Sequence, residues 1–307
     1  MFFRPYFLQL ISTLIIASIS FSTSADINSS SAFQGVETIV LKDESTVTAA
    51  VDHIVTELEQ QGFSIPLIIN HSAAATSVGL ELAPNQVIFA RPPKALEKRL
   101  LKKSNTMGLD LPMKFLVFED NDDIKLSVNS IGYLIDRHDL TIKDIVLKLT
   151  DKITEQFGKV NAQGHGLISI ESSQSIDDTV QAIQDVLSAN PEVRIPLVLD
   201  YRKQNKYSDR REYNRHNFRR NHNLPPVLIV FGNPNVGTPL MQADPQIGID
   251  LPLEFLVWSD KQSQVYITYN DPHFIAERFN IEDQNARLDA IANVLKNIAQ
   301  AAADDNL

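Results

Sequence analysis

The chain of 307 residues has no cysteine, and this absence excludes several kinds of chemistry. Disulfides, thiolate metal sites, a cysteine nucleophile and a lipid-anchored cysteine are all ruled out. The sequence also lacks the HExxH spacing of a zinc site, the GxSxG turn of a serine hydrolase, and the lysine and spacing of a phosphate-binding loop. We therefore expect no metal and no cofactor, and the sequence names no reaction.

Long hydrophobic runs are missing everywhere except at the N-terminus. There Arg4 precedes an apolar run from Phe7 to Phe21, and small residues follow it up to Ala25. The run is shorter than the roughly 20 residues that a membrane span needs, so it is typical of a cleaved signal peptide. We expect a signal peptide over residues 1–25, cleavage after Ala25, a periplasmic or secreted protein and no membrane span after cleavage. The alternative is an uncleaved N-terminal anchor. The Ser-rich residues 26–34 predict a disordered lead-in.

The formal net charge is -10, so general binding of nucleic acid or anionic lipid is disfavoured. One segment differs, because Arg202 to His222 holds eight Lys or Arg against Asp209 and Glu212. We treat residues 201–223 as a basic insertion. It is either a solvated, partly flexible segment or a docking surface for an acidic partner, and nucleic acid is not expected there.

An internal repeat is the most informative feature of the chain. Residues Gly108 to Asp120 read GLDLPMKFLVFED, and Gly248 to Asp260 read GIDLPLEFLVWSD, with eight of thirteen positions identical. A period of 140 residues, from 108 to 248, has the length of a domain and indicates duplication of a whole folded unit. We expect a first domain over residues 35–160 and a second over 161–307, packed together as an intramolecular pseudo-dimer.

The hydrophobic pattern predicts the same order of elements in both units. The expected strands of the first unit are Val36–Leu41, Ile65–Ile69, Gln86–Ala90, Lys114–Glu119 and Lys125–Asn129. The expected helices are Val47–Leu58, Ala73–Ala75, Lys94–Lys103, Tyr133–Arg137 and Ile142–Phe157, and a helix over Ile281–Ala303 ends the second unit. Because the hairpins are local, a mainly antiparallel sheet covered by helices on one face is favoured, which gives the α+β class twice.

Two blocks of sequence resemble a known family. Phe231-Gly232-Asn233-Pro234, followed by Gly237-Thr238-Pro239-Leu240-Met241 and the second repeat, is similar to the hallmark of bacterial domain-of-unknown-function family 302 (DUF302). Asn70-His71 before Ala73–Ala75 is similar to another block of that family. The resemblance covers nearly the whole mature chain. It implies a small TATA-box-binding-protein-like fold of one strand, a helix, four strands and a helix, often dimeric, and it implies no established activity.

Each unit departs from the family pattern in a different place. The first has Ala90–Lys94 (ARPPK) where the family has its Gly-Asn-Pro loop, and the second has Asp200-Tyr201-Arg202 and the insertion in place of the histidine block. The loop from Gly232 to Thr238 could hold an anionic or carbonyl group on free backbone N–H groups. The expected ligand-binding residues are Gly232, Asn233, Gly237, Thr238 and His71.

Asp110 and Asp250 precede Leu-Pro in both units. Their favoured role is structural, with each carboxylate capping a turn by accepting backbone N–H bonds. The alternative is a carboxylate pair across the pseudo-twofold axis that performs acid and base chemistry.

Two functions follow from these sites. The favoured one is a non-enzymatic protein that binds a small ligand or a protein partner in the cleft between the units. The other is an enzyme, a hydrolase or an acid/base catalyst, with a composite site of Asp110, Asp250 and His71. The position of His71 relative to the Gly232–Thr238 loop discriminates between them, because a composite site requires the two to meet across the interface. A third possibility is association with anionic surfaces through the basic insertion.

Overall fold

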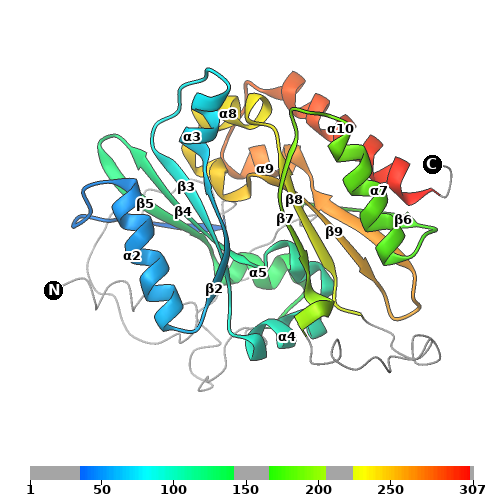
Figure 1. The fold of residues 1–307 in the computed structure, drawn as a ribbon. Helices are drawn as coiled ribbons and strands as arrows, with labels where there is room; N and C mark the ends of the chain where they lie inside the picture. Colours follow the sequence, from blue (N-terminus) through cyan, green and yellow to red (C-terminus); the bar gives the residue numbers. More distant parts are fainter. Residues whose placement is uncertain (1–34, 142–165, 205–223, 305–307) are drawn as a thin grey trace.

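A computed structural model describes residues 35–141, 166–204 and 224–304 (Figure 1). Several sequence expectations fall outside these ranges. They are the signal peptide, the lead-in, the helix over residues 142–157, the boundary near residue 160 and most of the basic insertion.

Each half forms one five-stranded antiparallel sheet, and the strand order is the same in both. The first sheet has the order β1-β5-β4-β3-β2, and the second has β6-β10-β9-β8-β7. The strands are β1 (Val36–Val40), β2 (Ser64–Asn70), β3 (Asn85–Arg91), β4 (Met113–Asp120), β5 (Asp123–Asn129), β6 (Leu167–Ser172), β7 (Arg194–Asp200), β8 (Val227–Gly232), β9 (Leu253–Ser259) and β10 (Val265–Asn270). The expected α+β class and the duplication are confirmed.

Helices join and cover the strands. The α-helices are α2 (Val47–Gln60), α3 (His71–Ser77), α4 (Lys94–Lys103), α5 (Ile131–His138), α7 (Ile176–Ser188), α8 (Pro234–Ala243), α9 (Pro272–Arg278) and α10 (Asn285–Ala303). Three short 3₁₀ helices are η1 (Asn105–Leu109), η2 (Tyr201–Gln204) and η3 (Pro245–Asp250). The last helix was expected from Ile281, but it begins at Asn285 because a turn precedes it.

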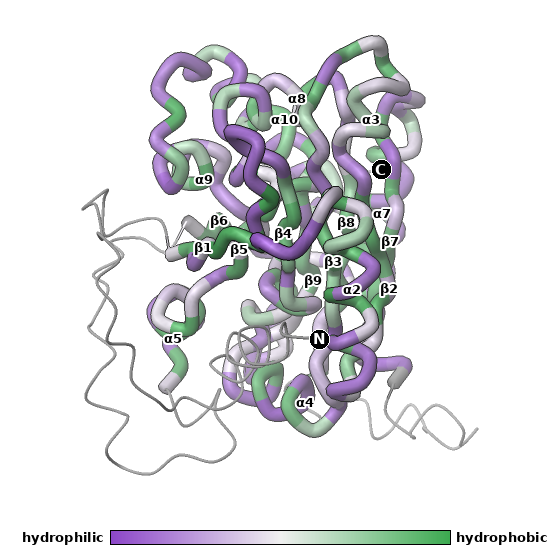
Figure 2. The backbone as a smooth tube through the Cα atoms, turned by 90° about the vertical axis from the view of Figure 1, so that its left-hand side faces the viewer, coloured by the Kyte–Doolittle hydropathy of each residue, from purple (hydrophilic) through white to green (hydrophobic). Residues whose placement is uncertain are grey.

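The outer face of each sheet carries long amphipathic helices. In α2 the Thr46 side chain caps the N-terminus by accepting from the N–H of Ala49, and Ala50, Ile54 and Leu58 recur on the buried face. Helix α2 covers the first sheet, and α7 and α10 cover the second (Figure 1). Figure 2 shows hydrophobic stretches of chain along the strands and hydrophilic stretches in the outer loops.

The inner faces of the two sheets are covered as well, because the halves pack against each other. Side chains alternate along a strand, so Lys114 and Leu116 of β4 point to one face and Phe115 and Val117 to the other. Lys114 reaches Glu254 of the second half, so that face is the interface. The apolar run Phe-Leu-Val in each repeat is therefore buried on both sides.

The first glycine of each repeat allows this close packing. A Cβ atom on Gly108 would lie 2.6 Å from Cδ1 of Leu256, and one on Gly248 would lie 3.0 Å from Cδ1 of Leu116. Gly108 and Gly248 therefore let η1 and η3 lie directly on the sheet of the opposite half, in equivalent positions. This reciprocal contact is the expected pseudo-twofold arrangement.

Candidate functional site

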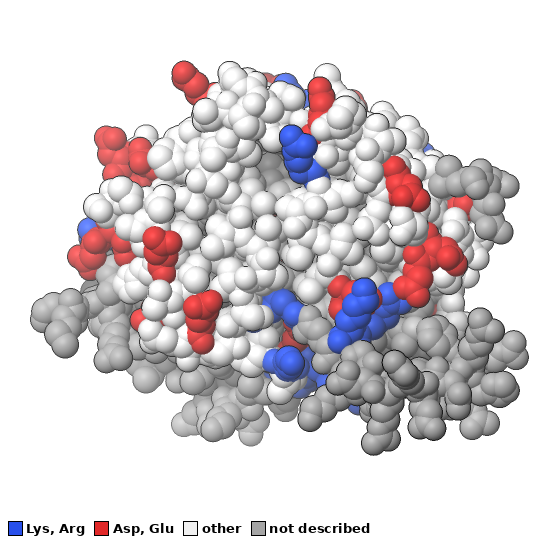
Figure 3. Space-filling view, viewed as in Figure 1, with Lys and Arg blue, Asp and Glu red and all other residues white. Residues whose placement is uncertain are grey.

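A cavity of about 710 Å³ lies between α8, α10 and the ends of β7 and β8. Helix α3 of the first half packs on α8 and contributes His71 and Ala74 to its wall. Most of the wall is aliphatic, with Leu, Ile, Val and Met side chains from α8, α9 and α10. In the view of Figure 3, the upper part of the molecule has a hollow with a basic side chain beside it. The cavity is thus a composite of both halves.

All five residues expected to bind a ligand line this one cavity. They are Gly232, Asn233, Gly237 and Thr238 from the second half and His71 from the first. The structure therefore brings His71 to the glycine loop across the interface, which was the geometric condition for a composite site. Asp110 and Asp250 are not among the described residues that line it.

The backbone of the glycine loop is already hydrogen-bonded. Asn233 caps α8, and its Oδ1 accepts from the N–H of Asn235 at 2.9 Å. The carbonyl oxygen of Asn233 accepts from the N–H groups of Val236 and Gly237, both at 3.0 Å. Pro234 has no N–H to offer. The N–H groups of Asn235, Val236 and Gly237 are therefore already used within the turn and are not free to hold an anion.

Thr238 supplies such a side chain. Its residue is only 1% exposed, and its hydroxyl oxygen has no hydrogen-bond partner within the described ranges. A buried polar group without a partner costs about 1–3 kcal/mol. A polar ligand atom in the cavity would therefore stabilise the protein by satisfying Thr238.

His71 lines the cavity as a neutral ring. It is 4% exposed, and its Nε2 lies 3.2 Å from the carbonyl oxygen of Gly248, so the neutral ring donates from Nε2. Burial lowers the pKa of His71 to about 4, against a smaller opposing effect of the carbonyls of Gly248 and Leu251. His71 is therefore a weak base near neutral pH and joins α3 to η3 of the opposite half.

The corresponding space in the first half is filled by a salt bridge. Arg91 donates to both carboxylate oxygens of Glu97, at 2.9 and 2.7 Å, and both side chains are mostly buried. The Arg91 guanidinium also lies over the ring of Tyr201, 5.6 Å from its centroid. Tyr201 follows β7 as His71 follows β2, so it occupies the equivalent place in the other half.

Both members of this salt bridge are replaced by glycine in the second half. Arg91 pairs with the first residue of β2, and Gly232 pairs with the first residue of β7, so the two positions are equivalent. Glu97 is the fourth residue of α4, and Gly237 is the fourth residue of α8. The two glycines, together with His71 in place of Tyr201, leave open the space that Arg91 and Glu97 fill.

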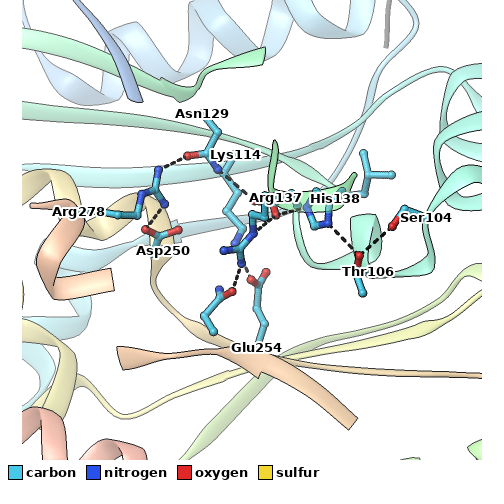
Figure 4. A network of polar contacts seen from close by, with 12 residues as sticks. Ser104, Thr106, Lys114, Asn129, Arg137, His138, Asp250, Glu254 and Arg278 are labelled. Carbon is cyan, nitrogen blue, oxygen red and sulfur yellow. Dashed lines mark hydrogen bonds and ion pairs between the residues drawn. The ribbon is translucent and has the colours of Figure 1, made fainter. Parts of the chain in front are cut away.

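Asp110 and Asp250 belong to a separate buried network, and Figure 4 shows Asp250 and other members of it. Oδ2 of Asp110 accepts from Nε of Arg137 at 2.9 Å and from Nε2 of His138 at 2.7 Å. Oδ2 of Asp250 accepts from Nη1 of Arg278 at 2.6 Å. The partners of both carboxylates are side chains rather than the backbone N–H groups that the sequence predicted. The structural role was expected, but its mechanism differs.

Each arginine of this network also reaches into the opposite half. Arg137 donates to Oδ1 of Asn270, and Arg278 donates to Oδ1 of Asn129 at 2.8 Å. Burial alone would raise the pKa of Asp110, but Arg137 and His138 hold it well below its usual range. Asp110 therefore stays ionised and is a poor proton donor or acceptor.

A second buried ion pair lies across the pseudo-twofold axis. Nζ of Lys114 is 2.5 Å from Oε2 of Glu254, and both side chains are at most 1% exposed. The two residues hold the same place in the repeat, where a symmetric dimer would bring identical side chains together. Duplication has allowed opposite charges there. Burial raises the pKa of Glu254, and the attraction of Lys114 only partly offsets it.

The sequence interpretation did not identify Lys114, Glu254, Arg137 or Arg278. Two signals in the sequence could have pointed to them. Asn and Arg stand eight residues apart in both units, at 129 and 137 and at 270 and 278. Lys114 and Glu254 also occupy the same position in otherwise similar copies of the repeat.

The described part of the basic insertion is small. Arg202 donates from Nε to Asp200 at 2.8 Å and from Nη2 to Asp177 at 2.6 Å, and Lys203 lies 3.6 Å from Asp200. These two cations are therefore partnered within the second half, and residues 205–223 lie outside the described ranges. Within the residues that the structure covers, no group of three or more His, Asp or Glu could hold a metal ion.

The chain is similar to a solved structure and, over a short stretch, to curated proteins. The crystal structure of an uncharacterized conserved protein DUF302 from Bacillus stearothermophilus aligns with 12% identity and a TM-score of 0.36, covering 45% of this chain and 98% of that chain. Fluoride-specific ion channel FluC 1 of Brucella suis biovar 1 (strain 1330) is 49% identical over 59 residues, 19% of this chain and 23% of the channel. FluC 1 of Brucella abortus biovar 1 (strain 9-941) matches over the same length, 22% of that channel.

The chain thus spans less than a quarter of the channels that it matches. None of the helices in the described ranges combines the length and hydropathy that a membrane crossing requires. The sequence profile of one family, described as "Domain of unknown function DUF302", matches residues 39–159 and 219–302, which is most of the chain and includes both halves. The chain therefore belongs to the DUF302 family.

Proposed function

We propose that this protein binds a small, largely apolar molecule in the cavity between its two halves and is not an enzyme. The observation that carries the proposal is the difference between equivalent sites. The first half fills the space with Arg91 and Glu97, whereas the second half has Gly232 and Gly237 there, and no described residue is a hydrogen-bond partner of the Thr238 hydroxyl.

The dimensions and chemistry of the cavity fit such a ligand. Small-molecule sites commonly enclose about 300–1,000 Å³ and combine an apolar wall with a few placed polar groups. The cavity of about 710 Å³ lies in that range, and its wall is mainly aliphatic. Thr238 and His71 are the buried side chains in it that can hydrogen-bond a ligand.

The enzymatic alternative has less support. Asp110 is held ionised by Arg137, and neither Asp110 nor Asp250 lies on the described wall of the cavity. His71 would act there without a carboxylate beside it, and its lowered pKa makes it a weak base. The part of the cavity wall that the structure describes therefore offers His71 no carboxylate to pair with for acid and base chemistry.

Export is part of the same proposal. It rests on the signal-peptide pattern of residues 1–25, and the protein would act in the periplasm or outside the cell. Intact mass measurement of the protein from its native cell should give a chain that begins at Asp26. A chain that retains residues 1–25 would contradict export by cleavage.

A pair of substitutions at Gly237 tests the binding proposal. A Cβ on Gly237 would meet only Cδ1 of Leu251, at the ordinary distance of 3.6 Å, so a side chain can be added there without strain. Gly237→Leu should fill part of the cavity, and Gly237→Ala should leave most of it open. Both should keep or raise helix stability, since glycine is the poorer helix former by about 1 kcal/mol.

The assay is titration with the neutral, apolar dye N-phenyl-1-naphthylamine, followed by fluorescence. We expect saturable binding to the wild type and to Gly237→Ala, and binding at least about tenfold weaker to Gly237→Leu. Thermal unfolding of each variant controls for folding. The absence of saturable binding to the wild type, or equal binding by a folded Gly237→Leu, would refute the proposal.

A further inference from the structure

We propose that the ligand of this cavity is a single-chain amphipathic acid, with its carboxylate at Arg194 and Arg287 and its hydrocarbon chain along α10. This inference rests on the proposed function and specifies the class of ligand. It follows from the charge of the wall and from the order of residues along one helix.

The charged side chains of the cavity wall all have the same sign. Of the described residues that line it, Arg194 and Arg287 are charged, and none is Asp, Glu or Lys. Glu192 accepts from Nδ2 of Asn233 at 3.0 Å, but it is not among the described residues that line the cavity. The cavity therefore attracts an anionic group.

Both guanidinium groups remain available to a ligand. Arg91, Arg137, Arg202 and Arg278 each pair with a carboxylate of the protein. In contrast, no carboxylate of the described chain lies within ion-pair distance of Arg194 or Arg287. Within the described ranges, Nε of Arg287 donates to the side-chain oxygen of Gln284 at 3.1 Å. Planar guanidinium groups suit a carboxylate because they can donate two parallel hydrogen bonds.

The start of α10 adds to the positive potential. Ala286 and Arg287 belong to its first turn and line the cavity. The N-cap residue, Gln284, makes no side-chain capping hydrogen bond. The N-terminus of a helix carries a partial positive charge, so it reinforces the charge of Arg287 at this end of α10.

An aliphatic stripe continues from this cationic end. Ile291, Val294, Leu295 and Ile298 recur at helical spacing on the same face of α10, and all line the cavity. Val294 is 55% exposed and extends the stripe to the protein surface. From Arg287 to Ile298 the helix rises about 16 Å, which is the length of roughly a dozen extended methylenes. The wall thus matches a head followed by a linear tail.

Displacement of N-phenyl-1-naphthylamine by three compounds with the same tail tests the inference. The compounds are dodecanoate, 1-dodecanol and dodecyltrimethylammonium, and the proteins are the wild type, Arg194→Gln/Arg287→Gln and Lys296→Gln. Lys296 is an exposed cation on α10 that does not line the cavity, so it is the matched control.

We expect dodecanoate to displace the dye from the wild type and from Lys296→Gln at a concentration at least about tenfold lower than dodecanol. The double variant should lose this preference, and added salt should weaken binding of the acid but not of the alcohol. Equal affinity for acid and alcohol, tighter binding of the cation, or an unchanged preference in the double variant would overturn the inference while leaving the binding site in place. If the dye itself does not bind the wild type, the proposed function fails first, and this inference fails with it.

Discussion

The buried pair Lys114–Glu254 gives the sharpest prediction about how the two halves hold together. Both side chains are at most 1% exposed, and the pair lies on the pseudo-twofold axis. Removing one member of a buried ion pair leaves an uncompensated charge and costs about 3–5 kcal/mol. Replacing both members by apolar residues of similar size is often neutral or stabilising. The perturbation is therefore a cycle of Lys114→Met, Glu254→Leu and the double variant.

The two single variants should differ in cost. Burial raises the pKa of Glu254 even though Lys114 lowers it, so in Lys114→Met, where that attraction is lost, the carboxyl can become neutral by taking up a proton. Glu254→Leu instead leaves the buried ammonium group of Lys114 without its counter-charge. We expect Glu254→Leu to cost about 3–5 kcal/mol at pH 7, and Lys114→Met to cost less, with a penalty that shrinks as the pH falls. The double variant should lie within about 1 kcal/mol of the wild type.

Urea unfolding provides the assay, because Trp258, the single tryptophan of the chain, lies in β9 and reports on the second sheet. Far-UV circular dichroism should be followed in parallel, since a two-domain chain can unfold in more than one step. The reasoning is refuted if the effects of the two single variants simply add in the double variant. It is also refuted if Lys114→Met is as costly at pH 5 as at pH 8.

Three further predictions concern packing, capping and pH. Gly108→Ala should destabilise the protein by about 1–3 kcal/mol in urea unfolding, because its Cβ would lie 2.6 Å from Cδ1 of Leu256. An unchanged free energy of unfolding would contradict the close contact. Asn233→Ala should cost about 1 kcal/mol through loss of the cap of α8, whereas Asn233→Asp should keep most of it. The pKa of His71 is lowered from 6.5 to about 4 in the folded protein. Its contribution to stability is thus present above pH 6.5 and lost as the pH falls toward 4. The difference in unfolding free energy between wild type and His71→Gln should narrow by up to about 3 kcal/mol from pH 7 to pH 4, and parallel profiles would contradict the buried, neutral state.

The sequence predicted the architecture well because both copies of the duplicated unit carry the same pattern. The repeat from Gly108 and from Gly248 gave the two domains, and the hairpins and helical spacings gave the α+β class. The five residues proposed for ligand binding lie on one cavity wall, since the family pattern had kept His71 in one half and the glycine loop in the other.

What covers the inner faces of the sheets was harder to predict from the sequence. The sequence predicted helices on one face of each sheet, and the structure covers the other face with the opposite half. The uninterrupted apolar run from Phe115 to Phe118 indicated that both faces of the strand are buried. A strand with one solvent-exposed face would alternate apolar and polar residues. The pairs Arg91–Glu97 and Lys114–Glu254 depend on tertiary contacts between elements that are distant in sequence. The loop amides were expected to be free because a sequence does not show that the carbonyl oxygen of Asn233 accepts from two of them.

A crystal structure with bound 12-bromododecanoate would test most directly whether the second half has kept a site that the first half has filled. The bromine should give an anomalous peak beside the aliphatic stripe of α10, with the carboxylate at Arg194 and Arg287. The space beside Arg91 and Glu97 should give none. A bromine peak in both halves, or a cavity that stays empty at saturating ligand, would contradict this explanation of the duplicated fold.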